Sequence, residues 1–139
     1  MSFREKIHWV ALTAIATAFG WYFLTIAWRA DDPAGLLALG GLLLLATIGV
    51  VVVMTLATVF LALRNPAEVN LKEDERDRSI HWRGTHFAYY PMIVGTWSCI
   101  GLIFAGVSQT GLLNLLLAMV VVAELIRIGS QIWLYRRGY

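Results

Sequence analysis

Four long apolar runs separated by polar segments define the pattern of this chain. They cover residues 7–28, 35–63, 87–107 and 112–135. About 20 apolar residues in a helix cross the hydrocarbon layer of a bilayer, and each run reaches that length. The pattern therefore predicts an all-α, polytopic membrane protein in which residues 1–139 form a single domain of four transmembrane helices.

The first run has a second interpretation, as a cleaved signal peptide. Ala14, Ala16 and Ala18 provide cleavage sites of the A-x-A type. However, the apolar character continues past them through Phe23 and Ile26, and another long apolar run follows soon after. We therefore expect the first helix to be retained.

The polar segments between the runs differ in length. Residues 29–33 and 108–111 are short enough to be tight turns, which predicts two helical hairpins. Residues 64–86 connect the hairpins and carry half of the charged residues of the chain. Within this connection, residues 71–83 have acids and bases three or four positions apart, which favours an amphipathic helix. Gly84 is predicted to end that helix.

Positive charge is distributed unequally between the two sides of the predicted helices. Nine lysines and arginines fall on the side of the two termini and the central connection, whereas the two turns on the other side contain only Arg29. The nine are Arg4, Lys6, Arg64, Lys72, Arg76, Arg78, Arg83, Arg136 and Arg137. The positive-inside rule then places both termini and residues 64–86 on the cytoplasmic side of the membrane.

Composition supports lipid as the solvent and excludes some functions. The chain is 59% hydrophobic and only 14% charged, with a mean hydropathy of +0.70, whereas soluble domains carry about a quarter of their residues as charge. A net charge of +2 is too small to favour binding to nucleic acid. The single cysteine, Cys99, has no partner for an internal disulfide.

The fourth run contains the ionisable pair Glu124 and Arg127, and Gln131 continues the same helix face. Glu124 is expected near the bilayer centre, where ionisable groups are costly and usually face the bundle interior or a wet cavity. Two interpretations stay open. The pair either holds the helices in register, or Glu124 is the protonatable site of a small proton-coupled transporter that acts as a homo-oligomer.

The central connection contains a second candidate site. Its members are Glu73, Asp74, Glu75, Asp77, His81 and His86. Asp74, Asp77 and His81 share a helix face, so a divalent metal of unknown identity is conceivable. Arg76 and Arg78 interleave with the acids and can neutralise them, which favours a solvated surface that docks a protein partner instead.

Histidine placement leaves one further alternative, a membrane redox subunit. Haem in a helical bundle is usually held by histidines on facing helices at similar depth, and His8 and His86 meet this condition if the first and third helices are neighbours. Otherwise no cofactor is expected. The chain has no nucleophile–base pair, phosphate loop or dinucleotide fingerprint, which argues against an enzyme.

The stretch KEDERDRSIHWRGTH, residues 72–86, resembles a group of uncharacterised small prokaryotic inner-membrane proteins. These proteins have four helices and an E-D-E-R-D type segment before the third. The resemblance covers the hairpin layout and residues 73–83. It implies a partnership with small helix-turn-helix regulators in signalling or immunity. It supplies no catalytic residue, and Glu124 and Arg127 are not part of it.

The leading hypothesis is a small inner-membrane accessory or regulatory protein. Its central segment would dock a cytoplasmic regulator or another membrane protein. A homodimer is compatible with this hypothesis, because Gly95/Cys99 and Gly101/Ala105 are small-xxx-small pairs that allow close helix approach within the chain or between copies.

Overall fold

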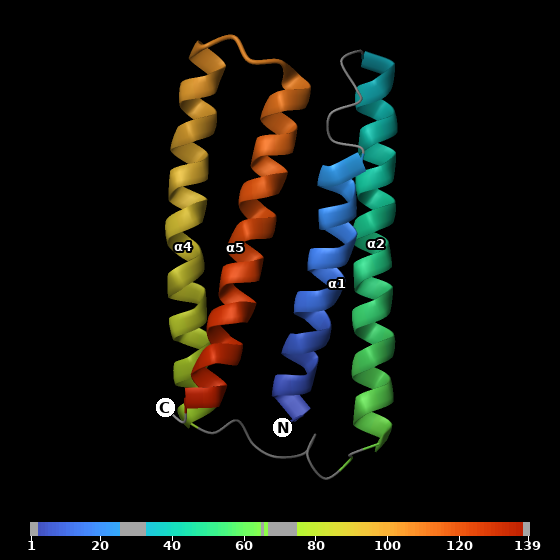
Figure 1. Ribbon diagram of the computed structural model, residues 1–139, viewed down its shortest axis with the longest axis vertical. Helices are drawn as coiled ribbons and strands as arrows, with labels where there is room; N and C mark the ends of the chain where they lie inside the picture. The colour runs from blue at the N-terminus through green and yellow to red at the C-terminus, as the bar shows by residue number, and fades with distance from the viewer. Residues whose placement is uncertain (1–2, 26–32, 65, 67–74, 138–139) are drawn as a thin grey trace.

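The computed structural model describes residues 3–25, 33–64, 66 and 75–137 of the 139-residue chain. These residues form four long helices and contain no strand (Figure 1). The helices are α1 (Phe3–Thr25), α2 (Pro33–Arg64), α4 (Glu75–Phe104) and α5 (Gln109–Arg137). Each is long and apolar enough to cross a membrane. The predicted all-α class with four such helices is therefore confirmed.

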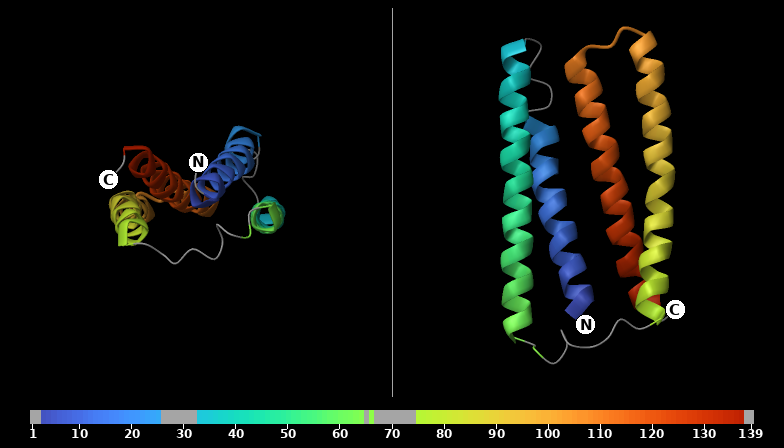
Figure 2. Two further views of the ribbon diagram at one scale, coloured as in Figure 1. Left: turned by 90° about the horizontal axis from the view of Figure 1, so that it is seen from below. Right: turned by 180° about the vertical axis from the view of Figure 1, so that it is seen from behind.

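The helices lie side by side in the spatial order α4, α5, α1, α2 (Figure 1). Helix α5 packs against both α4 and α1, and α1 also packs against α2. Seen along their axes, the four helices form an open arc with α4 and α2 at its two ends (Figure 2). Helix α5 therefore holds α4 and α1 in position through its contacts with both.

Small residues allow α4 to approach α5 closely. Gly84, Gly95 and Cys99 are buried on one face of α4. Side chains of Gln131 and Met119 on α5 occupy the space that a Cβ would take at Gly84 and Gly95, respectively. The pair Gly95/Cys99 thus contributes to packing within the chain, whereas Gly101 is exposed and faces no neighbour within 4 Å.

One prediction about the central connection is wrong. Gly84 does not end a helix, because α4 continues through it from Glu75 to Phe104 and includes residues placed at the start of a separate third span. The absence of a side chain at Gly84 instead leaves room for the side chain of Gln131 from α5. Pro91 lies well inside α4. It removes one backbone hydrogen bond there, a loss that long apolar helices tolerate.

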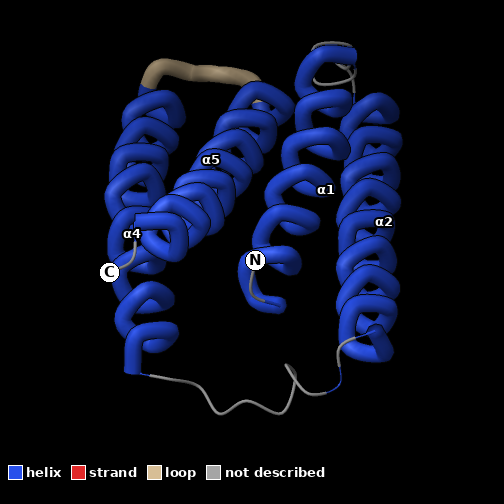
Figure 3. The backbone as a smooth tube through the Cα atoms, turned by 60° about the horizontal axis from the view of Figure 1, so that its bottom comes forward, coloured by secondary structure: helices blue, strands red, loops and turns tan. Residues whose placement is uncertain are grey.

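Charged residues concentrate where α1 and α4 begin and where α2 and α5 end, and we call this the charged end. Of the lysines and arginines that the structure describes, all except Arg127 lie there. The described residues at the opposite end include the loop between α4 and α5, which carries no charge (Figure 3). The polarity of the molecule therefore runs along the helix axes.

The loop after α4 is closed by a glycine in the left-handed region. Gly106 has φ 73°. Its N–H donates to the Ile103 carbonyl over 3.1 Å, and the Val107 N–H donates to the Leu102 carbonyl over 3.2 Å. These two bonds form a Schellman motif, which satisfies carbonyl groups at the end of the helix and turns the chain toward α5.

Replacing Gly106 with alanine is expected to lower the free energy of unfolding by about 1 kcal/mol, because a Cβ disfavours positive φ. Equilibrium unfolding in detergent micelles measures the change. The control is Gly101→Ala, inside α4 and facing open space, which should be neutral or slightly stabilising. Equal losses in both variants would show that the left-handed turn contributes nothing.

Candidate functional site

Helix α5 carries a polar side chain in nearly every part of its length, and these side chains determine its contacts. Asn114 and Gln131 are buried, and Glu124, Arg127 and Tyr135 are partly buried. Their partners come from α1, from α4 or from α5 itself. The residues of the candidate site are therefore distributed along this helix.

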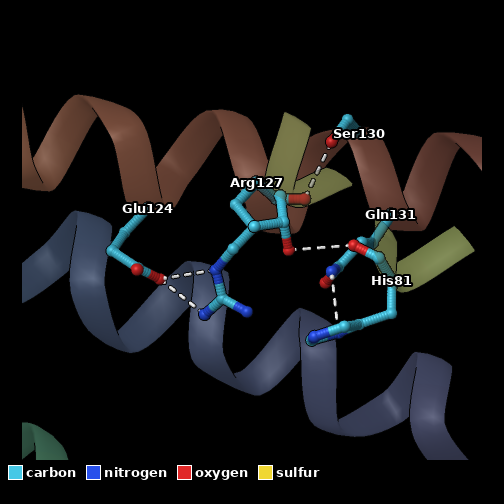
Figure 4. Close-up of polar contacts among 6 residues, drawn as sticks. His81, Glu124, Arg127, Ser130 and Gln131 are labelled. Carbon is cyan, nitrogen blue, oxygen red and sulfur yellow. Dashed lines mark hydrogen bonds and ion pairs between the residues drawn. The ribbon is translucent and has the colours of Figure 1, made fainter. Parts of the chain in front are cut away.

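Glu124 and Arg127 form the ion pair that their spacing predicts. The Nε and Nη2 groups of Arg127 donate to the same carboxylate oxygen, Oε2 of Glu124, over 3.0 and 2.6 Å (Figure 4). Glu124 lies about 22 Å from Gln109 and about 20 Å from Arg137 along the helix, at its middle. The arginine reaches back toward Glu124, away from the charged end, so each charge compensates the other half-way along α5.

The described residues around the pair do not enclose it. The side chains of Arg127 and Glu124 are 31% and 41% exposed. Oε1 of Glu124 accepts no bond from the residues that the structure describes. The pair is thus neutral as a whole but incompletely hydrogen-bonded.

Gln131 does not join this pair, although the spacing of the three residues places them on one helix face. Its side chain packs against Gly84 on α4, and its Nε2 lies 3.5 Å from Nδ1 of His81 (Figure 4). Gln131 is only 1% exposed, and its Oε1 has no partner within the described part of the chain. Gln131 therefore belongs to the contact between α5 and α4.

Three residues from three helices meet at the charged end, and we call Arg4, Asp77 and Tyr135 the clamp. The hydroxyl of Tyr135 on α5 donates to Asp77 on α4 over 2.8 Å. Arg4 on α1 pairs with the same carboxylate at 3.0 Å. Asp77 therefore binds residues of the bundle and does not belong to an outward-facing acidic surface.

A second set of contacts reinforces the clamp. Arg136 lies 3.5 Å from Glu5 and places its guanidinium 5.3 Å from the ring centre of Trp9, so α5 and α1 are also joined on this side. Arg76 donates to the backbone carbonyl of Tyr135 over 3.2 Å. The start of α4 is consequently fixed to the end of α5 by more than one interaction.

A small polar pocket of about 190 Å³ adjoins the clamp. Its lining consists of Arg4, His8, Asp77, Ile80, His81, Gln131 and Tyr135. Most of these polar groups already bond to one another. Nδ1 of His8 bonds to the Arg4 carbonyl at 2.6 Å, and its ring lies 5.8 Å from that of Tyr135. The pocket has room for water or a very small polar molecule.

The histidines do not form the pair considered for haem. His8 and His81 line the polar pocket, whereas His86 is exposed and contacts Tyr90 one turn further along α4, at 3.3 Å. Among the described residues, no three His, Cys, Asp or Glu side chains lie close enough together to hold a metal ion. Two acids of the cluster, Glu73 and Asp74, lie outside the described residues.

Reasoning from the sequence missed the contact between Tyr22 and Asn114. The Tyr22 hydroxyl donates to Oδ1 of Asn114 over 2.7 Å, and both side chains are buried between α1 and α5. Tyr22 also packs with Leu39 of α2. A signal existed, because Asn114 is the one strongly polar residue in residues 112–123.

Comparison of the chain with protein-family models, with curated proteins and with solved structures finds no match.

Substituting Tyr22 with phenylalanine is expected to lower the free energy of unfolding by about 1 kcal/mol, because Asn114 loses a buried donor. Unfolding in detergent micelles should be measured for Tyr22→Phe, Asn114→Leu and the double variant. The double variant should lose less stability than the sum of the two single losses, and the difference is a coupling energy of about 1 kcal/mol. Strictly additive effects would argue against the bond. Thr17→Val, which removes only a bond within α1, provides a control with little expected change.

Proposed function

We propose that this chain is an integral protein of a prokaryotic inner membrane with its charged end in the cytoplasm. Four helices of sufficient length and apolarity support the insertion. The concentration of described lysines and arginines at one end supports the orientation through the positive-inside rule. The helices then form two hairpins, and both α1 and α4 begin at the cytoplasmic face.

Within this arrangement, we propose a non-enzymatic accessory or regulatory role in which the start of α4 docks a partner. The observation that supports this role is that this helix segment has one face toward the bundle and one exposed face. Asp77 and Ile80 face the bundle, while Glu75, Arg78 and Trp82 share the opposite face at i, i+3 and i+7. Trp82 is 72% exposed.

The exposed face has the composition of a recognition surface. Tryptophan and arginine are the residues most often found at the energetic centres of protein interfaces. The described contacts leave Arg78 and Trp82 without a partner in the bundle, and the clamp holds the helix beneath them in place. A preorganised surface binds with a smaller entropic cost than a mobile one.

The partner that best suits this face is a soluble cytoplasmic protein. Alternating acidic and basic side chains beside a membrane orient a charged partner as it approaches. The resemblance of residues 73–83 favours a small regulator of the helix-turn-helix type. Of the residues first assigned to docking, Glu75 remains on this face, whereas Asp77 and His81 turn toward the bundle and His86 lies further along α4.

The geometry gives less support to proton-coupled transport through Glu124. The carboxylate already accepts two hydrogen bonds from Arg127, so protonation would have to break an ion pair. Glu124 does not line the polar pocket at the charged end. A structural or assembly role accounts for the pair with fewer assumptions.

Docking predicts that a photo-cross-linking amino acid at position 82 captures a discrete protein adduct in intact cells. The matched control is position 97, also an exposed tryptophan on α4 but close to the opposite end of the helix. Arg78→Glu should reduce the adduct at position 82 at least fivefold, because it reverses the charge at the centre of the face.

Arg64→Glu, the same charge change at the end of α2, controls for general electrostatic effects and should leave the adduct intact. An adduct that survives Arg78→Glu, or that forms equally at position 97, would remove the docking hypothesis. If position 82 yields lipid adducts and no protein adduct, Trp82 belongs to the membrane interface and the docking hypothesis is rejected.

A further inference from the structure

The Glu124–Arg127 pair lies on the inner side of the helix arc. Glu124 shares a face of α5 with Tyr135, eleven residues further on. Tyr135 bonds Asp77 of α4, and Asp77 in turn reaches Arg4 of α1, so α4 and α1 approach each other on this side of α5. Glu124 therefore faces the same concave side as the clamp, about 16 Å further from the charged end.

The neighbouring residues on α5 confirm this position. Ile128 and Ile132 are buried against Ala11 of α1. Met119 and Gln131 pack against the glycines of α4. Glu124 falls between these two contact faces, in the seam that the arc leaves open. Exposure of its side chain follows from that location.

An open ion pair at this depth needs another polar partner in a bilayer. Glu124 lies about 20 Å from either end of α5, beyond the reach of the polar headgroups. Arg127 offers five N–H donors and uses two of them on Glu124, and Oε1 of Glu124 has no bond from the described residues. Polar groups left unsatisfied in hydrocarbon cost several kcal/mol each.

A second copy of this chain supplies the complementary groups without another component. A two-fold axis beside α5 brings Glu124 of each copy to the arginine of the other copy's ion pair, because a C2 interface matches a surface with itself. The result is a ring of four alternating charges with no net charge. The contact between the two copies then satisfies the groups that the described residues of one chain leave without a bond.

We propose that two copies of this chain associate in the membrane through the inner side of the arc, with Glu124 of each copy bonded to Arg127 of the partner subunit. The inference uses the proposed insertion into a bilayer and is independent of the docking role. Loss of the dimer and loss of the cytoplasmic adduct are therefore separate observations.

Charge exchange tests the proposed contact between copies. Glu124→Arg and Arg127→Glu each bring like charges together at the axis, so each variant alone should self-associate at least about tenfold more weakly than the wild type in lipid nanodiscs. Co-expressed under two different affinity tags, the two variants should co-purify, because the mixed dimer restores opposite charges. The double variant should self-associate like the wild type.

Monomeric wild-type protein would overturn the proposal, as would single variants that dimerise normally. Cross-linking provides a second test that keeps the ion pair intact, in case a single variant does not fold. On a Cys99→Ala background, Val120→Cys lies one turn from Glu124 on the same face and should form an intermolecular disulfide on oxidation. Val122→Cys, on the opposite face and similarly exposed, should not. Equal cross-linking of both positions, or of neither, contradicts the proposed axis.

Discussion

Helix α5 is shaped by one constraint, that polar side chains in an apolar surrounding must bond to protein. Asn114 bonds Tyr22 on α1, Gln131 approaches His81 on α4, and Tyr135 bonds Asp77. Each contact selects a neighbour and a register for α5. Apolar packing alone is less selective, because lipid chains surround a leucine as favourably as another helix does.

The same constraint underlies both proposals, the docking surface at the start of α4 and the contact between two copies at the middle of α5. At the charged end, the clamp bonds α1, α4 and α5 to one another and thereby holds the start of α4, whose outer face carries the exposed Arg78 and Trp82. At the middle of α5, the Glu124–Arg127 pair remains incompletely bonded by the part of the chain that the structure describes. Complete contacts thus stabilise the subunit, and the incomplete one is assigned to assembly.

Much of the helical layout follows from the sequence, because long apolar runs leave few alternatives to a helix in a bilayer. The internal pairing of Glu124 with Arg127 was likewise predictable from their spacing. The role of Gly84 was not, since a glycine is equally compatible with a helix end and with a close helix contact. The clamp was missed for a related reason, because Asp77 looks solvent-exposed until Arg4 and Tyr135 are brought to it by the packing of α1 and α5.

Both the docking surface and the contact between copies require insertion of all four helices, and docking also requires the charged end to lie in the cytoplasm. Labelling of single-cysteine variants with a membrane-impermeant maleimide in intact cells, on a Cys99→Ala background, tests this directly. Ser108→Cys, in the uncharged loop between α4 and α5, should react from outside, whereas Arg78→Cys should react only after the membrane is permeabilised. Labelling of Arg78→Cys in intact cells, with Ser108→Cys protected, would contradict the orientation and with it the docking surface.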